Sequence, residues 1–246
     1  MEQLQVRGWK LSDVGCVRQQ NEDACFLLEE EDLLLGIVCD GMGGAKAGEV
    51  ASRIAARIFS KTVLEEEGTP QERMRVALER ANRAVYQHSW MHAECRGMGT
   101  TMVAVLILED TAYILNVGDS RCYASVKGRI FQITRDHSLV EELVRSGTLT
   151  PEQARYHPNR NIITRALGTE RSIMGDLFIH TLQPGELLLL CSDGLSNEMT
   201  DNEMCEQLII GPPEDACQRL INAALDRGAR DNVTALVIAV QERKEQ

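Results

Sequence analysis

The sequence lacks any hydrophobic run long enough to cross a membrane. Its longest apolar stretches, residues 102–108 and 235–240, are far shorter than the roughly 18 residues that indicate a membrane-spanning helix. The N-terminal residues also lack the basic and then apolar pattern of a signal peptide. We therefore expect a cytoplasmic protein that does not bind membranes.

Positive charge is scarce as well. The 246 residues include 26 Lys and Arg against 37 Asp and Glu, which gives a formal net charge of −11. Because nucleic-acid binding draws its affinity from Lys and Arg on phosphates, this balance argues against a nucleic-acid partner.

Cysteine and histidine motifs are also missing. The eight cysteines form no Cys-x-x-Cys pair, and the five histidines form no His-Glu-x-x-His motif. We expect buried free thiols, with neither disulfides nor a zinc site. His88 and His92 are one helical turn apart, and a solvated helix face is the better interpretation of that spacing.

No stretch is rich in Pro or Ser, and no repeat or linker is visible, so residues 1–246 are predicted to form one domain. Strand patterns alternate with helical patterns in blocks. The predicted strands are residues 6–14, 24–29, 33–39, 100–108, 112–117, 121–126, 129–133, 176–182, 186–191 and 233–240. The longer predicted helices cover residues 48–67, a segment capped at Thr69, another capped at Thr200, and residues 213–227.

Short connections between residues 100 and 133 predict an antiparallel meander, which a parallel doubly wound fold would not contain. The block order predicts an α/β protein with a four-layer αββα sandwich. In it, two mainly antiparallel β-sheets pack face to face and are flanked by helix pairs. Residues 145–172 combine two short capped helices with irregular chain, so we expect a mobile flap there.

Four aspartates lie at the ends of predicted strands. Asp40, Asp119 and Asp193 each follow an apolar run, and Asp231 comes just before one. In an antiparallel sheet, a strand that ends in Asp and a neighbour that begins with Asp place both carboxylates at the same rim. The sequence thus predicts an acidic edge suited to hard divalent cations, which prefer oxygen ligands.

Two further segments carry chemistry. Arg18 precedes the adjacent acids Glu22 and Asp23 and could hold a phosphate by bidentate hydrogen bonds, although the same residues also fit a polar turn. Asp40 opens a glycine-rich turn in which the Gly41 carbonyl could approach a cation. A plain turn or a phosphate loop is the alternative, but the lysine of a phosphate loop is missing.

Eight short motifs occur in a fixed order along almost the whole chain. They are Arg18 with Asn21-Glu22-Asp23, Asp40-Gly41-Met42-Gly43-Gly44, Gly99-Thr100-Thr101, Gly118-Asp119-Ser120-Arg121, Asp136-His137, Thr164-Arg165-Ala166-Leu167-Gly168, Ser192-Asp193-Gly194 and Asp231-Asn232. This series resembles the motifs of the type 2C metal-dependent protein phosphatases. It is most similar to the single-domain bacterial serine/threonine phosphatases.

The resemblance implies metal-dependent hydrolysis of phosphoserine and phosphothreonine in proteins, by a water that two Mn²⁺ or Mg²⁺ ions activate. Such activity reverses serine/threonine kinase signalling. The implied partners are phosphorylated proteins, including a cognate kinase, and we expect a monomer. Two ions would bind tightly and a third weakly. The implied metal ligands are Glu22 through water, Asp23, Asp40, the Gly41 carbonyl, Asp119 at the third ion, Asp193 and Asp231. Arg18 would bind the substrate phosphate and form the catalytic set with Asp40 and Asp193.

The chain departs from the family pattern at Met42. Animal members of the family have histidine there, which is taken to protonate the leaving alkoxide, and a thioether cannot do this. The general acid is therefore open between water and a histidine from elsewhere. His137 is the nearest candidate by motif, but we interpret it as structural. Two other functions remain as alternatives, an inactive phosphoprotein-binding module of the same fold and a small-molecule phosphoesterase.

Overall fold

The computed structural model describes residues 4–43 and 47–242, so Gly44 of the Asp40 turn motif lies outside the described residues. The strands are β1 (Leu4–Asp13), β2 (Asp23–Glu29), β3 (Leu33–Met42), β4 (Gly99–Thr100), β5 (Met102–Leu108), β6 (Thr111–Val117), β7 (Arg121–Val126), β8 (Arg129–Gln132), β9 (Asp176–Thr181), β10 (Leu187–Cys191) and β11 (Val233–Glu242). The helices are α1 (Ala47–Glu65), α2 (Pro70–Met91), α3 (Leu139–Arg145), α4 (Pro151–Arg155), α5 (Asp193–Ser196), α6 (Asp201–Ile209) and α7 (Ala216–Leu225), with 3₁₀ turns η1 (Ala93–Cys95) and η2 (Pro213–Asp215).

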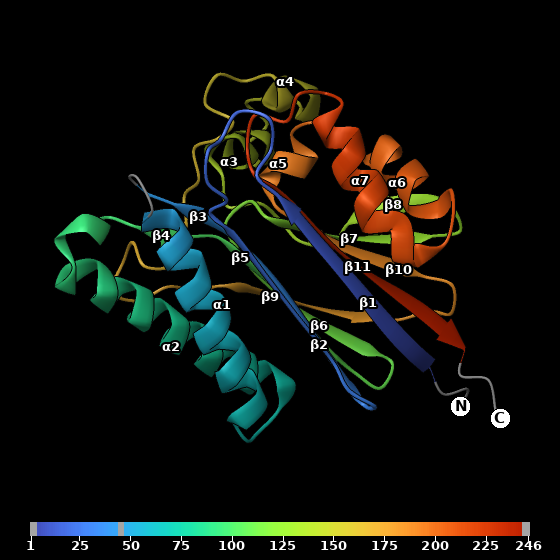
Figure 1. Ribbon diagram of the computed structural model, residues 1–246, viewed down its shortest axis with the longest axis horizontal. Helices are drawn as coiled ribbons and strands as arrows, with labels where there is room; N and C mark the ends of the chain where they lie inside the picture. Colours follow the sequence, from blue (N-terminus) through green and yellow to red (C-terminus); the bar gives the residue numbers. More distant parts are fainter. Residues whose placement is uncertain (1–3, 44–46, 243–246) are drawn as a thin grey trace.

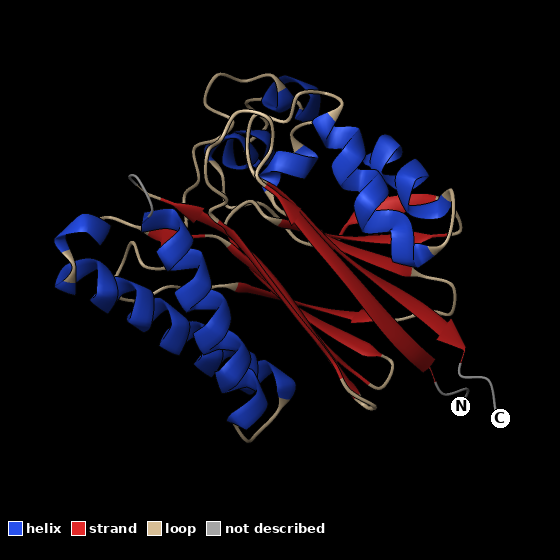
Figure 2. Cartoon of the chain, in the orientation of Figure 1, coloured by secondary structure: helices blue, strands red, loops and turns tan. Residues whose placement is uncertain are grey.

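Two antiparallel sheets pack face to face. One has the strand order β1-β11-β10-β7-β8, and the other has the order β2-β3-β5-β6-β9, with the short β4 paired to β3. Helices α1 and α2 cover the outside of the second sheet, and α6 and α7 cover the outside of the first (Figures 1 and 2). The predicted four-layer αββα sandwich is therefore confirmed.

The alternation of side chains along each strand explains the three layers of core. On β3, Leu35, Ile37 and Cys39 pack toward the helices, while Leu34 and Val38 pack toward the opposite sheet. Strand β11 alternates in the same way between the α7 side and the inter-sheet core. Strands that are buried on both faces read as continuous apolar runs, which is why these segments stand out in the sequence.

The predicted antiparallel meander is wrong at one connection. Strands β5 and β6 form a hairpin in one sheet, whereas β7 and β8 form a hairpin in the other. The chain crosses between the sheets at Gly118, whose φ of 102° favours glycine. The predicted strand 100–108 is also divided, because β4 ends at Thr100 and β5 begins at Met102. Asp119 lies in the turn by which the chain passes from β6 in one sheet to β7 in the other.

The predicted helix caps are present. The Thr69 hydroxyl accepts a hydrogen bond from the Glu72 N–H, and the Glu72 carboxylate accepts one from the Thr69 N–H. Thr150 and Thr200 form the same reciprocal capping boxes at α4 and α6. The sequence did not predict the single turn of α5, which begins at Asp193.

The end of the predicted flap is tied to the rest of the molecule. Leu167 and Thr100 exchange two backbone hydrogen bonds of 2.8 and 3.0 Å, and the Gly168 N–H donates to Asn82 Oδ1 of α2 at 2.8 Å. Leu167 is fully buried, whereas α4 has no buried residue. Only the first part of the segment therefore projects from the fold. It lies at the end of the sandwich where β3 ends and β11 begins (Figure 1).

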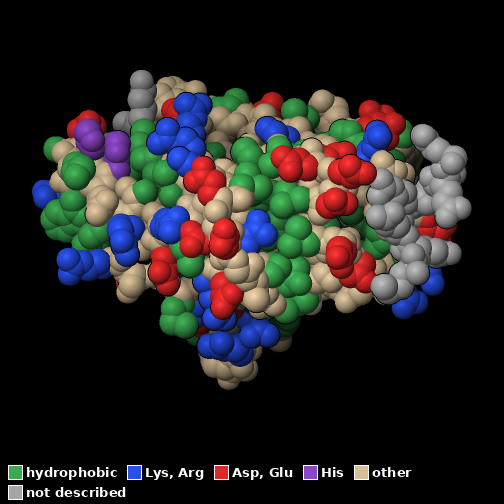
Figure 3. Space-filling view, turned by 90° about the horizontal axis from the view of Figure 1, so that it is seen from below, with side chains coloured by type: hydrophobic (Ala, Val, Ile, Leu, Met, Phe, Trp, Pro, Cys, Tyr) green, Lys and Arg blue, Asp and Glu red, His purple; other side chains and the backbone are tan. Residues whose placement is uncertain are grey.

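The described residues include no helix that is both long and apolar enough to span a bilayer. On the face drawn in Figure 3, Lys and Arg side chains are interspersed with Asp and Glu side chains. All eight cysteines are free thiols, and six of them are buried.

Candidate metal centre

The predicted aspartates meet at one end of the sandwich. Asp23 begins β2 and Asp40 lies near the end of β3, and the two residues are directly opposite each other in the antiparallel register. Asp193 follows β10, and Asp231 precedes β11, its antiparallel neighbour in the other sheet. The crossover after β6 brings Asp119 to the same place, since its carboxyl interacts with that of Asp193. We call this group of five aspartates the acidic rim.

Burial and mutual repulsion raise the pKa values of four carboxyls, those of Asp23, Asp40, Asp119 and Asp193. Burial raises the pKa of Asp23 to about 7, against two hydroxyl hydrogen bonds that favour the charged form. Burial, followed by the charges of Asp23 and Asp193, holds the pKa of Asp40 well above its usual range. Burial also raises the pKa of Asp119 and Asp193. Negative charge is therefore costly here unless a cation offsets it.

Two oxygens of the rim fit a bound cation. Asp23 Oδ1 and Asp193 Oδ1 are both buried and have no hydrogen-bond partner. A buried polar atom without a partner is costly, and the all-oxygen donor set suits Mg²⁺ or Mn²⁺. The carboxylates do not form a ready coordination sphere, because no three His, Cys, Asp or Glu side chains of residues 4–43 and 47–242 are grouped to hold a metal as they stand. The residues fit a hard cation in chemistry and burial, and their orientation would have to adjust on binding.

Gly41 lies where the backbone of β3 touches the start of α1. A Cβ atom at this position would lie 2.1 Å from the Gly48 carbonyl oxygen and 2.5 Å from the Glu22 carbonyl oxygen. The Glu22 carboxylate accepts a hydrogen bond from the Gly48 N–H, and burial raises its pKa. Glu22 is thus turned toward the N-terminus of α1, which agrees with an indirect rather than a direct role at a metal.

Arg18 is held at the rim by Asp231. Its Nη2 atom lies 2.8 Å from Asp231 Oδ2, and both side chains are partly exposed. Asn232 fixes the loop that carries Arg18, since its Oδ1 accepts the Glu22 N–H at 2.8 Å and its Nδ2 donates to the carbonyls of Val14 and Gln20 at 2.9 Å. Asn232 belongs to the Asp231-Asn232 motif of the sequence, but its role in fixing this loop is visible only in the fold.

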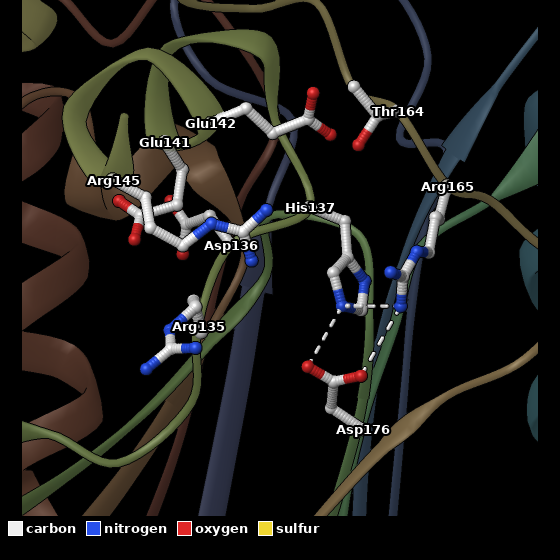
Figure 4. Close-up of a pocket in the computed structure, with 9 residues that line it drawn as sticks. All are labelled: Arg135, Asp136, His137, Glu141, Glu142, Arg145, Thr164, Arg165 and Asp176. Carbon is white, nitrogen blue, oxygen red and sulfur yellow. Dashed lines mark hydrogen bonds and ion pairs between the residues drawn. The ribbon is translucent and has the colours of Figure 1, made fainter. Parts of the chain in front are cut away.

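The ring nitrogens of His137 contact Gly118, Arg165 and Asp176, none of which belongs to the acidic rim. Its Nδ1 accepts the Gly118 N–H at 3.1 Å, so the neutral ring carries its proton on Nε2, which lies 3.3 Å from Asp176. Arg165 contacts the same Asp176 at 3.2 Å, and the three side chains converge in a cavity of about 60 Å³ (Figure 4). Burial lowers the pKa of His137. This geometry supports the interpretation of His137 as structural, because it holds the turn before Asp119.

The sequence profile of the family described as Protein phosphatase 2C matches residues 17–236. The serine/threonine phosphatase stp of Listeria monocytogenes serovar 1/2a is 37% identical over 234 residues, which cover 92% of this chain and 93% of that protein. The crystal structure of the Mycobacterium tuberculosis serine/threonine phosphatase PstP/Ppp superposes with a TM-score of 0.89 at 36% identity, covering 97% of this chain and 99% of that one. A crystal structure of the PstP catalytic domain in complex with two manganese ions has a TM-score of 0.86 at 35% identity, covering 97% and 99% of the two chains.

Proposed function

Because this chain belongs to the protein phosphatase 2C family and is a serine/threonine protein phosphatase, we propose that it uses two Mn²⁺ or Mg²⁺ ions at the acidic rim to hydrolyse phosphoserine and phosphothreonine in proteins. The observation that carries the metal proposal is the pair of buried, unpartnered oxygens on Asp23 and Asp193. The relative that crystallised with two manganese ions supports it. A binding module without activity would not need five aspartates gathered at one end of the sandwich.

We assign the ions to groups at the same end of the sandwich, which would reorient on binding. Asp23, Asp40, Asp193, Asp231 and the Gly41 carbonyl would hold the tight pair, with Glu22 acting through water. Asp119 would serve a third, weaker ion. When bound, such cations offset charge on phosphoryl oxygens and make a coordinated water more acidic. The protein supplies a rim of carboxylates, most of them buried, and a partly exposed Arg18 that would hold the phosphate.

The substrate class can be tested directly. Purified protein should release phosphate from a phosphothreonine peptide when Mn²⁺ is added, and should stop when the metal is chelated. A nucleoside monophosphate and an aryl phosphate, assayed in parallel, distinguish a protein phosphatase from a small-molecule phosphoesterase. Faster turnover per enzyme on the nucleotide than on the peptide would overturn the proposed substrate.

Replacing Arg18 with alanine should raise the KM for phosphopeptide about tenfold and lower kcat by less. A charge-assisted hydrogen bond is worth roughly 1.5–3 kcal/mol, and a group that grips phosphate before and during the reaction contributes mainly to binding. Initial rates over a range of peptide concentrations measure both constants. Arg227 forms a similarly exposed ion pair with Glu203 and provides the control, Arg227→Ala. An unchanged KM with a collapsed kcat would assign Arg18 to the transition state alone.

Removing the Asp119 carboxylate should spare the two tight metal sites and reduce turnover at low Mn²⁺. Asp119 lies in the crossover turn between β6 and β7, and its main charged neighbour in the rim is Asp193. Asp119 would hold an ion there, and the acidity that such an ion gives to bound water would provide the proton source that Met42 cannot provide. Calorimetry on Asp119→Ala should still detect two strong sites. Loss of a strong site would move Asp119 into the primary pair.

We further propose that the chain forms one catalytic domain with a flap at residues 145–172. The anchored end of the flap is paired with Thr100 through Leu167. The next residue, Thr101, donates its N–H to the Asp40 carbonyl at 2.9 Å. Residues 100 and 101 therefore contact both the flap and the rim. Deleting residues 153–159 should impair hydrolysis of a folded phosphoprotein more than that of an aryl phosphate. Equal losses on both substrates would exclude a role in substrate selection.

Phosphorylated proteins are the partners that this activity requires, and we propose that they include a cognate serine/threonine kinase, with the enzyme acting as a monomer. Sedimentation of the purified protein tests the monomer, and dephosphorylation of the kinase from the same organism tests the partner.

A further inference from the structure

Two hydroxyl groups grip one oxygen of Asp23. Ser192 Oγ donates to Asp23 Oδ2 at 2.8 Å, and Thr234 Oγ1 donates to the same oxygen at 2.6 Å. Both hydroxyl residues are fully buried, and Asp23 is only 8% exposed. Asp23 begins β2 of one sheet, whereas Ser192 and Thr234 belong to the β10 and β11 region of the other. The contact therefore fixes an acidic side chain from across the sandwich.

The surrounding hydrogen bonds dictate the direction of these donors. Ser192 Oγ accepts the Thr234 N–H at 3.0 Å, so its own proton is available for Asp23. Thr234 gives its single hydroxyl proton to Asp23, and Ser12 Oγ, 2.7 Å from Thr234 Oγ1, must then donate to it. Ser12 in turn accepts from Asn21 Nδ2 at 2.8 Å. Every donor in this series of hydrogen bonds therefore points toward the Asp23 carboxylate.

The two oxygens of Asp23 are consequently not equivalent. Oδ2 has two short donors, while Oδ1 is buried with no partner. The outer torsion of an aspartate is broad and roughly two-fold, so without the two hydroxyls either oxygen could take either place. Groups that orient a ligand typically change metal affinity by about 10- to 100-fold when they are removed.

We propose that Ser192 and Thr234 are positioning residues that hold Asp23 Oδ2 so that Oδ1 is presented to a divalent cation. This inference rests on the proposed metal-dependent function and adds that the hydroxyl pair, which touches neither substrate nor cation, sets the metal affinity. We call Ser192 and Thr234 the hydroxyl clamp. The clamp also explains how a carboxylate at a sheet edge remains ordered at a buried position without an ion pair.

The central test is calorimetric titration of Mn²⁺ into the full chain and its variants. Thr234→Val is close to isosteric and removes one clamp hydroxyl, so it should weaken Mn²⁺ binding by about 10- to 100-fold. Thr234→Ser keeps the hydroxyl and should stay close to the parent affinity. Thr134→Val is the matched control, because Thr134 is also buried but its hydroxyl accepts from the Cys122 N–H. Thermal unfolding without metal checks that each variant is folded.

Kinetics separate positioning from damage to the fold. Phosphate release by Thr234→Val should require more Mn²⁺ for half-maximal rate, while the KM for phosphopeptide at saturating Mn²⁺ stays near that of the parent. If Thr234→Val does not fold, Ser192→Ala provides the same comparison, with Ser125→Ala as its control, since Ser125 is a buried strand serine that contacts Cys205.

The proposed role of the clamp is contradicted if a folded Thr234→Val or Ser192→Ala variant binds Mn²⁺ as tightly as the parent. It is also contradicted if Thr234→Ser loses as much affinity as Thr234→Val. It is also overturned if the parent takes up no Mn²⁺. A parent that binds Mn²⁺ but releases no phosphate from the peptide contradicts the proposed function alone, and the affinities still decide whether the clamp exists.

Discussion

Asp40→Asn and Asp193→Asn should each lower turnover on a phosphothreonine peptide by about a thousandfold and, at the same time, stabilise the metal-free protein. The expected loss corresponds to roughly 4 kcal/mol, because a cation at the reacting centre contributes several kcal/mol and each variant removes one of its charged ligands. Asn has nearly the shape of Asp, so the strand ends should keep their positions. Steady-state kinetics at fixed Mn²⁺ measure the loss.

The expected gain in stability follows from the raised pKa values. Burial raises the pKa of Asp40 and of Asp193, and the charges of neighbouring rim aspartates raise both further. When an acid has a higher pKa in the folded state than in the unfolded state, its ionisation lowers the folding stability of the protein. This loss occurs as the pH rises from about 4 through the folded pKa. At pH 8 the neutral amide avoids this cost, whereas near pH 4 the parent carboxyl is also protonated and the difference should vanish.

Urea unfolding without metal at pH 5 and pH 8 checks this sign. The stability gain of each Asn variant over the parent should be larger at pH 8 than at pH 5, and saturating Mn²⁺ should reverse it by stabilising only the parent strongly. Asp32→Asn, in the exposed turn between β2 and β3, is the control and should change neither activity nor the pH dependence. Near-parent activity of either rim variant at limiting Mn²⁺ would refute the assignment of these ligands.

The layers of the fold were predictable because alternation is a local property. Leu34 to Cys39 and Ala235 to Val240 contain no polar side chain, and strands of this kind must be covered on both faces. The choice of pairing partner is not local. Nothing between Val117 and Arg121 except Gly118 signals that β6 and β7 enter different sheets, so the sequence suggested one meander where there are two hairpins.

The rim was predictable for a similar reason, and its supports were not. An aspartate at a strand end can be read from its neighbours, whereas the groups that orient it lie far along the chain. Ser192 is 169 residues from Asp23 and Thr234 is 211 residues from it. Serine and threonine are also common beside strands, so the residue type alone does not indicate a contact with Asp23. The contact becomes visible only when the two sheets are packed face to face. The sequence thus locates the candidate ligands, and only the packing identifies what holds them.

Gly41→Ala should destabilise the protein by about 3 kcal/mol and abolish tight Mn²⁺ binding. Overpacking a filled site typically costs about 1–3 kcal/mol and sometimes more, and here the obstructing atoms cannot rotate away. The added Cβ would lie 2.1 Å from the Gly48 carbonyl oxygen and 2.5 Å from that of Glu22, both of which are backbone atoms. Either the start of α1 or the segment before Asp23 must therefore move.

Movement of either segment reaches the rim, because Asp40 precedes Gly41 and Asp23 follows Glu22. Gly211→Ala is the matched control, since its Cβ would meet only the flexible end of Arg219, at 3.2 Å. Urea unfolding of both variants without metal gives the stability difference, and calorimetry gives the Mn²⁺ affinity. A Gly41→Ala protein as stable as Gly211→Ala, with parent-like Mn²⁺ binding, would show that α1 can retreat without disturbing the carboxylates. The close contact between β3 and α1 would then have no part in building the metal centre.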